Sequence, residues 1–321
     1  MGNARLTPLT ESGILAAIAV LLGLMGTFLP VVGVLAVLLW ALPFLVLVVR
    51  QGLRYGMTAA VAASLVLALF TGPALSLRMF VAFAPTGLAL GFCFVRGFSG
   101  VRTFLTGLAA SVAGKLLGLL LLAVLMGVNP WQMQLDGMTE AFSASLSVYE
   151  SMGMTPTELA RVKGELDGAL TLLARLAPLV VLMMGLCDTV VLYAISPRVL
   201  ARLGVTLPQR LPPFSMWRLP SAFFYLFALS LIGLYWGRTH DLPELYTLAI
   251  NANMIAMFAG GIGGLSLLSA LCTHFHVSRF LRIFLYLFVL LNGLFLQILA
   301  FTGLIDMLFD YRGRLARRGG R

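Results

Sequence analysis

One lysine in the middle of an apolar stretch is the first residue whose type and place could serve chemistry. The stretch runs from Val101 to Gly127, and Lys115 stands in its "AGKL". A phosphate-binding loop needs a glycine, four further residues and then Gly-Lys-Ser/Thr. Ala109 occupies the position of the first glycine, and Leu116 replaces the hydroxyl residue that would bind magnesium. The stretch therefore predicts no nucleotide site, and Lys115 needs another explanation.

An acidic residue that could neutralise this lysine lies in the following apolar segment. Asp188 stands in "LVVLMMGLCDTVVLYAIS", about 10 Å from the inner end of that segment. Lys115 lies about 18 Å from either end of its own segment. A charge near mid-bilayer costs about 3 kcal/mol on insertion, so such residues usually face the helix bundle and have a partner. A structural ion pair, a site for a ligand or proton, and a lysine in a water-filled crevice are all open.

Two arginines begin apolar segments near the side of the membrane that we assign below as the outer one. These are Arg78 and Arg175. Together with Lys115 they would place three cations around one outer region, which suits an anionic or carboxylated ligand. Contact with lipid headgroups is the alternative for both arginines. We therefore take Lys115, Asp188, Arg78 and Arg175, in that order, as candidate ligand-binding residues.

The remaining polar residues form no motif for metal binding or catalysis. Cys272, His274 and His276 are spaced by two positions, which does not bring them to one face of a helix. No nucleophile with a neighbouring base and no pair of acidic residues stands out. We expect no metal site, no cofactor and no enzymatic activity.

The composition predicts a protein that crosses a lipid bilayer with helices. The 321 residues have a mean hydropathy of +1.00, with 60% hydrophobic and only 11% charged residues, whereas soluble domains carry about 25% charged residues. Apolar runs of about twenty residues recur, without the alternation of a membrane barrel. We predict an all-α polytopic membrane protein with about nine apolar segments, and roughly eight to ten are possible. The segments are 12–29, 31–49, 56–71, 75–95, 103–127, 172–195, 220–237, 243–273 and 279–308.

The arrangement of charges predicts the orientation of these segments. The net charge is +10, but the arginines lie in the connections between apolar segments, as in cytoplasmic loops, so we expect no nucleic-acid partner. Basic connections alternate with short or acidic ones, which places the N-terminus in the cytoplasm, residues 128–171 outside and residues 196–219 inside. The basic tail "YRGRLARRGGR" breaks this pattern, because nine crossings would put it outside. One segment does not cross, or a long segment bends back, or the tail is translocated.

The acidic outer connection contains the signature of a helix start. Thr155-Pro156-Thr157-Glu158 is a capping box with proline at the first helical position. Apolar residues then recur at spacings of three and four, which predicts an amphipathic helix that runs into the sixth apolar segment. This helix is either a connector that rests on lipid headgroups or a lid over an outward-facing pocket.

A basic, proline-rich connection divides the chain. Residues 196–219 contain four arginines and four prolines, so we predict a six-helix unit at 1–195, a cytoplasmic linker at 196–219 and a C-terminal membrane unit at 220–321. In "WRLP", Trp217 and Arg218 fit an anchor at the level of the headgroups. Alternatively, Arg210, Trp217 and Arg218 dock a cytoplasmic or membrane protein partner.

Three stretches together resemble a known family. They are "GILAAIAVLLGLMGTFLPVVGVLAVLLWALPFLVLVVRQGLRYG", "PPFSMWRLP" and "TGLIDMLFDYRGR". Over most of its length the chain resembles the YybS-like bacterial membrane proteins. Its first six segments also resemble the substrate-capture (S) components of energy-coupling-factor vitamin transporters. That second resemblance implies six helices, an inner N-terminus, an outward-facing small-molecule site and a transport-related role.

These observations support two functional predictions for a protein of the bacterial inner membrane. In the first, a bundle similar to an S component binds or moves a small solute, with an anionic one suited to the three cations. In the second, a membrane scaffold or regulator that transports nothing engages a partner through its basic inner loops. The two differ in where the function lies, either in an outer pocket or on an inner basic face.

Overall fold

The structure, a computed structural model, describes residues 7–127, 129–206, 211–309 and 311. These residues fold into helices joined by short connections, with no strand among them, which confirms the all-α prediction. Seven segments of the described chain are long and apolar enough to cross a membrane, or eight if one sharply bent helix pair is a single crossing. The protein is therefore a polytopic helical membrane protein. Its contacts divide it into two units, Met1–Leu211 and Pro212–Arg321.

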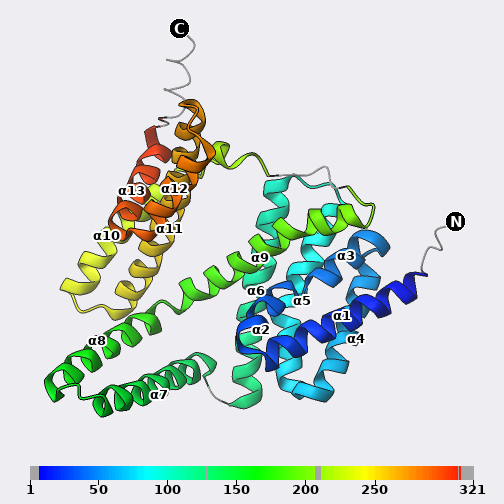
Figure 1. The fold of residues 1–321 in the computed structure, drawn as a ribbon, viewed down its shortest axis with the longest axis horizontal. Coiled ribbons are helices and arrows are strands. Elements are labelled where there is room, and N and C mark those ends of the chain that lie inside the picture. The colour runs from blue at the N-terminus through cyan, green and yellow to red at the C-terminus, as the bar shows by residue number, and fades with distance from the viewer. Residues whose placement is uncertain (1–6, 128, 207–210, 310, 312–321) are drawn as a thin grey trace, which may run out of the picture. The chain divides into compact units, whose positions relative to one another are not determined.

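The first unit begins with six helices that are separated by sharp turns at glycine and proline (Figure 1). Gly52 and Gly72 have φ of 97° and 83°, a region that glycine adopts without strain. Pro30 and Pro73 open helices directly after such breaks, where a missing N–H costs no hydrogen bond. The six helices are α1 (Pro8–Phe28), α2 (Pro30–Leu39), α3 (Leu42–Gln51), α4 (Leu53–Thr71), α5 (Pro73–Val95) and α6 (Gly100–Met126).

The second apolar segment of the sequence is two helices and not one. α2 ends at Leu39, and α3 begins at Leu42 with Pro43 in its first turn. The break places Trp40 and Phe44 in the core of the unit, where both are fully buried. Their ring centroids are 5.0 Å apart at an angle of 80°, the edge-to-face arrangement that aromatic pairs prefer.

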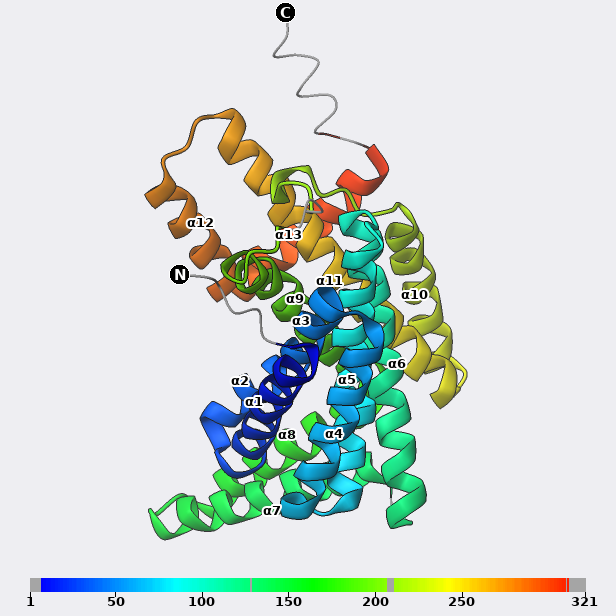
Figure 2. The same ribbon diagram turned by 90° about the vertical axis from the view of Figure 1, so that its right-hand side faces the viewer.

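The outer connection consists of two helices that project sideways from one end of the first unit (Figures 1 and 2). α7 (Pro130–Ser151) begins after Asn129, whose side chain caps it. α8 (Pro156–Arg175) has both hydrogen bonds of the capping box at Thr155 and Glu158, which confirms the predicted helix start. One residue separates α8 from α9 (Ala177–Arg202), so the amphipathic helix does run into the sixth crossing.

The second unit opens with a short 3-10 helix, η1 (Phe214–Met216), and an antiparallel pair of helices. The pair is α10 (Ala222–Thr239) and α11 (Pro243–His274). Gly237 of α10 packs against Tyr246 of α11, and the side-chain amide of Asn253 donates to the hydroxyl of Ser230 at 3.0 Å. α11 is a candidate membrane span, whereas α10 is not among the segments that meet the criteria for one.

The last apolar segment is broken in the middle. It forms α12 (Arg279–Leu291) and α13 (Gly293–Phe309), with a bend of 102° between them. α13 crosses α11 with almost no space between the backbones, since a methyl group on Gly303 would overlap the backbone of Gly260 and Gly264. A long final segment that bends back was one of the three explanations for the basic tail. The tail after Tyr311 lies outside the described residues.

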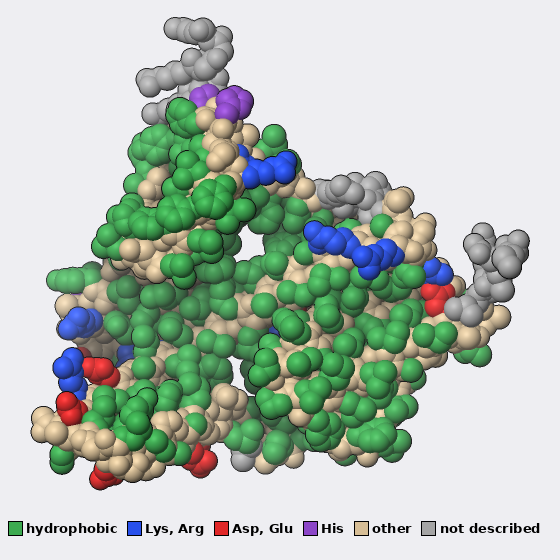
Figure 3. Space-filling model, in the orientation of Figure 1, with side chains coloured by type: hydrophobic (Ala, Val, Ile, Leu, Met, Phe, Trp, Pro, Cys, Tyr) green, Lys and Arg blue, Asp and Glu red, His purple; other side chains and the backbone are tan. Residues whose placement is uncertain are grey.

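Hydrophobic side chains cover most of the face that Figure 3 shows. Large apolar residues are exposed along nearly every helix, for example Leu69 of α4, Val124 of α6 and Leu229 of α10. Such a surface would be unstable in water over this extent, and lipid tails are its natural solvent. The exposed apolar surface therefore agrees with the membrane class that the composition predicts.

Candidate functional site

Lys115 and Asp188 form an ion pair between α6 and α9, which was one of the alternatives that the sequence left open. Both residues are almost fully buried, with 6% of Lys115 and 3% of Asp188 exposed. Ser111, one turn before Lys115, joins the pair: its hydroxyl accepts from Lys115 Nζ at 3.0 Å and donates to Asp188 Oδ2 at 3.3 Å. Lys115 Nζ also lies 4.7 Å from the centroid of the Phe83 ring, within the range of a cation–π interaction.

Small residues on α6 and α9 let the helices approach closely enough for this contact. A side-chain carbon on Gly114 would lie 2.7 Å from the carbonyl oxygen of Val81 in α5. One on Gly185 of α9 would lie 2.7 Å from the side chain of Val112 in α6. Close helix approach through small residues is common in membranes, because lipid offers no hydrophobic drive between helices. Gly185 therefore lets α9 approach α6 at the level of the ion pair, and Gly114 packs α6 against α5.

A cavity of about 430 Å³ opens beside Lys115 within the first unit. It is lined by α5, α6 and α9, and also by the N-terminal part of α7 and by Leu173 of α8. Its polar lining residues are Arg78, Lys115 and Gln134, and no carboxylate is among the lining residues. The others are Ala82, Phe83, Gly118, Leu119, Leu122, Pro130, Trp131, Met133, Met138, Leu173, Val180, Val181 and Met184.

Two hydrogen-bond donors in the cavity wall lack a partner among the described residues. The half-buried side chain of Arg78 makes no hydrogen bond or ion pair with any of them. The indole nitrogen of Trp131 is buried and likewise has no hydrogen-bond partner within the described chain. Buried donors are nearly always satisfied in proteins, so the unsatisfied indole nitrogen of Trp131 requires an explanation. A bound group with acceptor atoms would satisfy both.

The four candidate residues from the sequence are therefore not equivalent. Arg78 and Lys115 share the cavity, whereas Asp188 lies behind Lys115 and is not a lining residue. Arg175 lies half-buried in the last turn of α8 and does not line the cavity either. The sequence reasoning missed Ser111 and Trp131. Ser111 could have been found from its position four residues before Lys115, but no pattern singled out Trp131.

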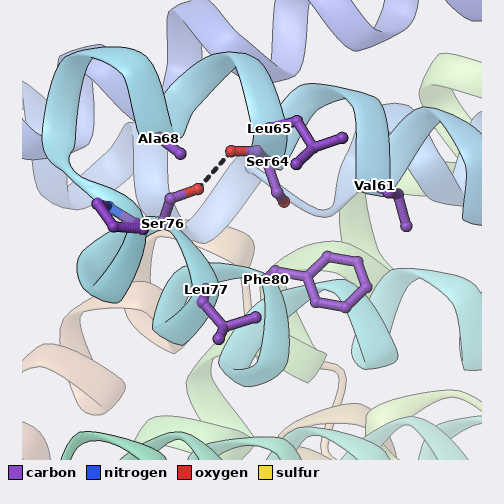
Figure 4. Close-up of a pocket in the computed structure, with 8 residues that line it drawn as sticks. Val61, Ser64, Leu65, Ala68, Ser76, Leu77 and Phe80 are labelled. Atoms are coloured by element: carbon purple, nitrogen blue, oxygen red, sulfur yellow. Dashed lines mark hydrogen bonds between the residues drawn. The ribbon is translucent and has the colours of Figure 1, made fainter. Parts of the chain in front are cut away.

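A second cavity lies between α4 and α5 and has a different character (Figure 4). Its volume is about 280 Å³. Its two hydroxyl groups are used within the protein, because Ser76 donates to the carbonyl oxygen of Ser64 and Ser64 donates to that of Ala60. The rest of the lining is apolar, so this cavity has no group to orient a polar solute. The apolar lining residues are Val61, Leu65, Ala68, Pro73, Leu77 and Phe80.

The residues considered for partner docking lie in the connection to the second unit. Arg210 lies outside the described residues. Trp217 is half-buried, and its indole N–H donates to the carbonyl oxygen of Pro212 at 2.8 Å. The buried Ser266 of α11 donates to the carbonyl oxygens of Phe214 and Trp217, at 2.6 and 3.1 Å. Trp217 therefore helps to fasten this segment to α11, Arg218 is exposed, and a docking role stays a prediction.

Comparison with known proteins identifies the family. The family model described as "Predicted membrane protein (DUF2232)" matches residues 17–307. Because this match covers most of the chain, the chain belongs to that family. The "Uncharacterized protein YybS" of Bacillus subtilis (strain 168) is 22% identical over 310 residues, which is 96% of this chain and 98% of that protein. These findings confirm the YybS-like resemblance. No solved structure matches the chain, and the likeness to S components stays a prediction.

Proposed function

We propose that this protein binds a small anionic solute in the cavity beside Lys115, as a step in moving that solute at the bacterial inner membrane. The observation that carries the proposal is the guanidinium group of Arg78. It lines the cavity, is half-buried, and has no hydrogen bond or ion pair to another described residue. Even partial withdrawal of a cation from water is unfavourable when the cation has no partner. A carboxylate or phosphate on the solute would supply two acceptors in the geometry that a guanidinium matches.

The other lining residues favour an anion with an apolar body. Lys115 is already neutralised by Asp188, so Arg78 is the cation whose charge is open to a ligand. Trp131 adds a second unsatisfied donor. Apart from Gln134, the remaining walls are apolar, aromatic or glycine. The cavity volume of about 430 Å³ lies within the range of roughly 300–1,000 Å³ that is usual for small-molecule sites.

The position of the cavity supports a solute that arrives from outside. α7 supplies the wall opposite α5 and α6, and it belongs to the acidic connection that the charge pattern assigns to the outer side. This arrangement agrees with the outward-facing site that the resemblance to S components implies. In this reading α7 and α8 are the lid, and the ion pair below them is the floor.

The experiment is a binding measurement on the purified protein in detergent. The probes are aliphatic and aromatic monocarboxylates, each paired with its uncharged amide. We expect carboxylates to raise the melting temperature and to bind at least tenfold more tightly than the matched amides. The Arg78→Gln variant should show no preference for carboxylates over amides. The Arg78→Lys variant should keep part of the wild-type preference, because lysine keeps the charge but not the bidentate geometry.

Arg161→Gln is the matched control. Arg161 is an exposed residue of α8 on the same side of the membrane, paired with Glu165 and outside the cavity. The Arg161→Gln substitution removes one positive charge, as Arg78→Gln does, but at a position outside the cavity. Carboxylate binding by this variant should therefore equal that of the wild type. Equal carboxylate binding by the wild type and Arg78→Gln would refute the proposal, as would tighter binding of the amides.

A further inference from the structure

We infer that α12 and α13 form a re-entrant hairpin, which enters and leaves the bilayer on one side and is covered by the acyl chains of that leaflet. The basic C-terminal segment then lies on the same side as Arg279. The inference starts from the lengths of the two helices. α12 has 13 residues and α13 has 17, which gives lengths of about 20 and 25 Å. Each is shorter than a hydrocarbon core of about 30 Å.

The bend between the helices supports a return and not a crossing. With 102° between the axes, a symmetric hairpin of these lengths reaches a depth of roughly 15–20 Å, about the middle of the bilayer. In both views the end of α13 lies at the same end of the second unit as the connection between α11 and α12 (Figures 1 and 2). The chain therefore comes back toward the side from which α12 starts.

The tip of the hairpin has the hydrogen bonding that hydrocarbon requires. Asn292 stands at the break, and its side-chain oxygen accepts from the N–H groups of Leu294 and Phe295, at 3.2 and 3.4 Å. Its own N–H donates to the carbonyl oxygen of Phe288 at 3.2 Å, and its carbonyl oxygen accepts from Leu296 at 3.0 Å. A helix break in lipid is tolerated only where the freed backbone groups find such partners.

The surface of the hairpin identifies lipid as its cover. Val289 is the only residue of α12 that is buried. Leu291 and Leu294, on either side of the tip, are 84% and 65% exposed. The far end of a crossing helix would meet water or headgroups, but this tip presents leucine and one asparagine that caps α13. Arg279 and Arg282, in contrast, mark the end at which α12 enters.

A re-entrant hairpin also removes the conflict at the tail. α10 packs antiparallel along α11, so we count it as a crossing with α11. The seven candidate spans and α10 then all precede Arg279, and this even number returns the chain to the side of the N-terminus. The tail, with the basic sequence "YRGRLARRGGR", joins the other basic connections on that side, as the distribution of positive charge in membrane proteins requires.

The test measures on which side of the membrane single cysteines react. Starting from a variant without the three native cysteines, Ser278→Cys probes the start of α12, Arg321→Cys the tail, and Asp241→Cys the turn between α10 and α11. A membrane-impermeant maleimide is applied to intact cells and to inverted vesicles. We expect Ser278→Cys and Arg321→Cys to react at least tenfold faster from the same side, and Asp241→Cys from the opposite side.

Cysteines at the tip test the depth of the hairpin. Asn292→Cys and Leu291→Cys should resist the impermeant reagent from both sides, and Leu291→Cys keeps the asparagine cap intact. Reaction of Arg321→Cys from the side of Asp241→Cys would overturn the inference, and so would rapid reaction of both tip cysteines from that side. Because the comparison is between positions in one chain, it does not depend on which side is the cytoplasm.

Discussion

Lys115 and Asp188 are 73 positions apart in the chain and meet in a buried ion pair between α6 and α9. Ser111 bridges both partners, so the hydroxyl, the ammonium group and the carboxylate form one network. Lys115 also lines the cavity. The ion pair therefore has two roles to be separated: it holds α6 and α9 together, and it forms part of the wall of a binding site.

A double-mutant cycle separates these roles. Lys115→Met leaves an acid without its partner, and breaking one side of a buried pair typically costs about 3–5 kcal/mol. Lys115→Met combined with Asp188→Asn leaves no uncompensated charge and should recover much of the loss. Thermal unfolding of Lys115→Met, Asp188→Asn and the double mutant in detergent, each compared with the wild type, measures the coupling. If the stability losses of the two single variants add up to the loss of the double mutant, the two residues do not interact. A folded double mutant that no longer binds carboxylates would assign the pair to the site.

Trp131→Phe tests the second donor in the cavity. The substitution keeps an aromatic ring in the wall and removes the indole N–H, which lacks a partner among the described residues. We expect the melting temperature without ligand to stay the same or rise, since an unsatisfied buried donor is lost. Carboxylate affinity should fall several-fold, as measured by calorimetry. Unchanged affinity would show that Trp131 only covers the cavity.

The contact between Lys115 and Asp188 could be predicted from the sequence because burying a charge without a partner is costly. Their segments are also neighbours. The start of α8 was also predictable, because a capping box is a local signal that needs no tertiary contact. The bend in the last segment was one of three explanations that the charge pattern left open.

Other features were not predicted, and most of them depend on packing between distant segments. α7 was not predicted, although Asn129 and Pro130 form a cap and a first helical position that could have marked its start. Trp131 enters the cavity wall because the first turns of α7 line the same cavity as α5 and α6. The break between α2 and α3 was also not predicted, and it places Trp40 and Phe44 in the core.

Gly303→Ala tests the close crossing of α11 and α13. A methyl group there would overlap the backbone of Gly260 and Gly264, which cannot move aside as a flexible side chain could. Overpacking of this kind costs about 1–3 kcal/mol, so the melting temperature should fall. Gly261→Ala is the matched control, because an added methyl at that position meets nothing within 4 Å. Equal effects of the two substitutions would exclude a tight backbone crossing.

The start of α8 should depend on pH. The side-chain hydroxyl and the backbone N–H of Thr155 donate to Glu158 and lower the pKa of its carboxyl group. The stabilisation is therefore complete above the pKa of an unfolded glutamate and is lost as the pH falls through the lower folded-state value. Hydrogen exchange of the amides of residues 157–161, corrected for the intrinsic rate, should show reduced protection at about pH 3 compared with about pH 7.

Glu158→Gln is the control for this titration. Glutamine can still accept from Thr155 but carries no proton to titrate, so the difference between the two pH values should largely disappear. Thr155→Ala removes the hydroxyl and should reduce protection at both values. Protection in the wild type that does not change with pH would contradict a role for the ionised carboxylate.

The orientation of the first unit can be tested with two exposed positions. Gly137→Cys lies on α7, and a side chain there meets nothing within 4 Å. Ala201→Cys lies in the last turn of α9 and is exposed. Because acidic residues dominate 128–171 and arginines dominate 196–219, we expect Gly137→Cys to react with an impermeant maleimide in intact cells and Ala201→Cys only in inverted vesicles. The opposite result would turn the cavity toward the cytoplasm, and the solute would then have to come from inside the cell.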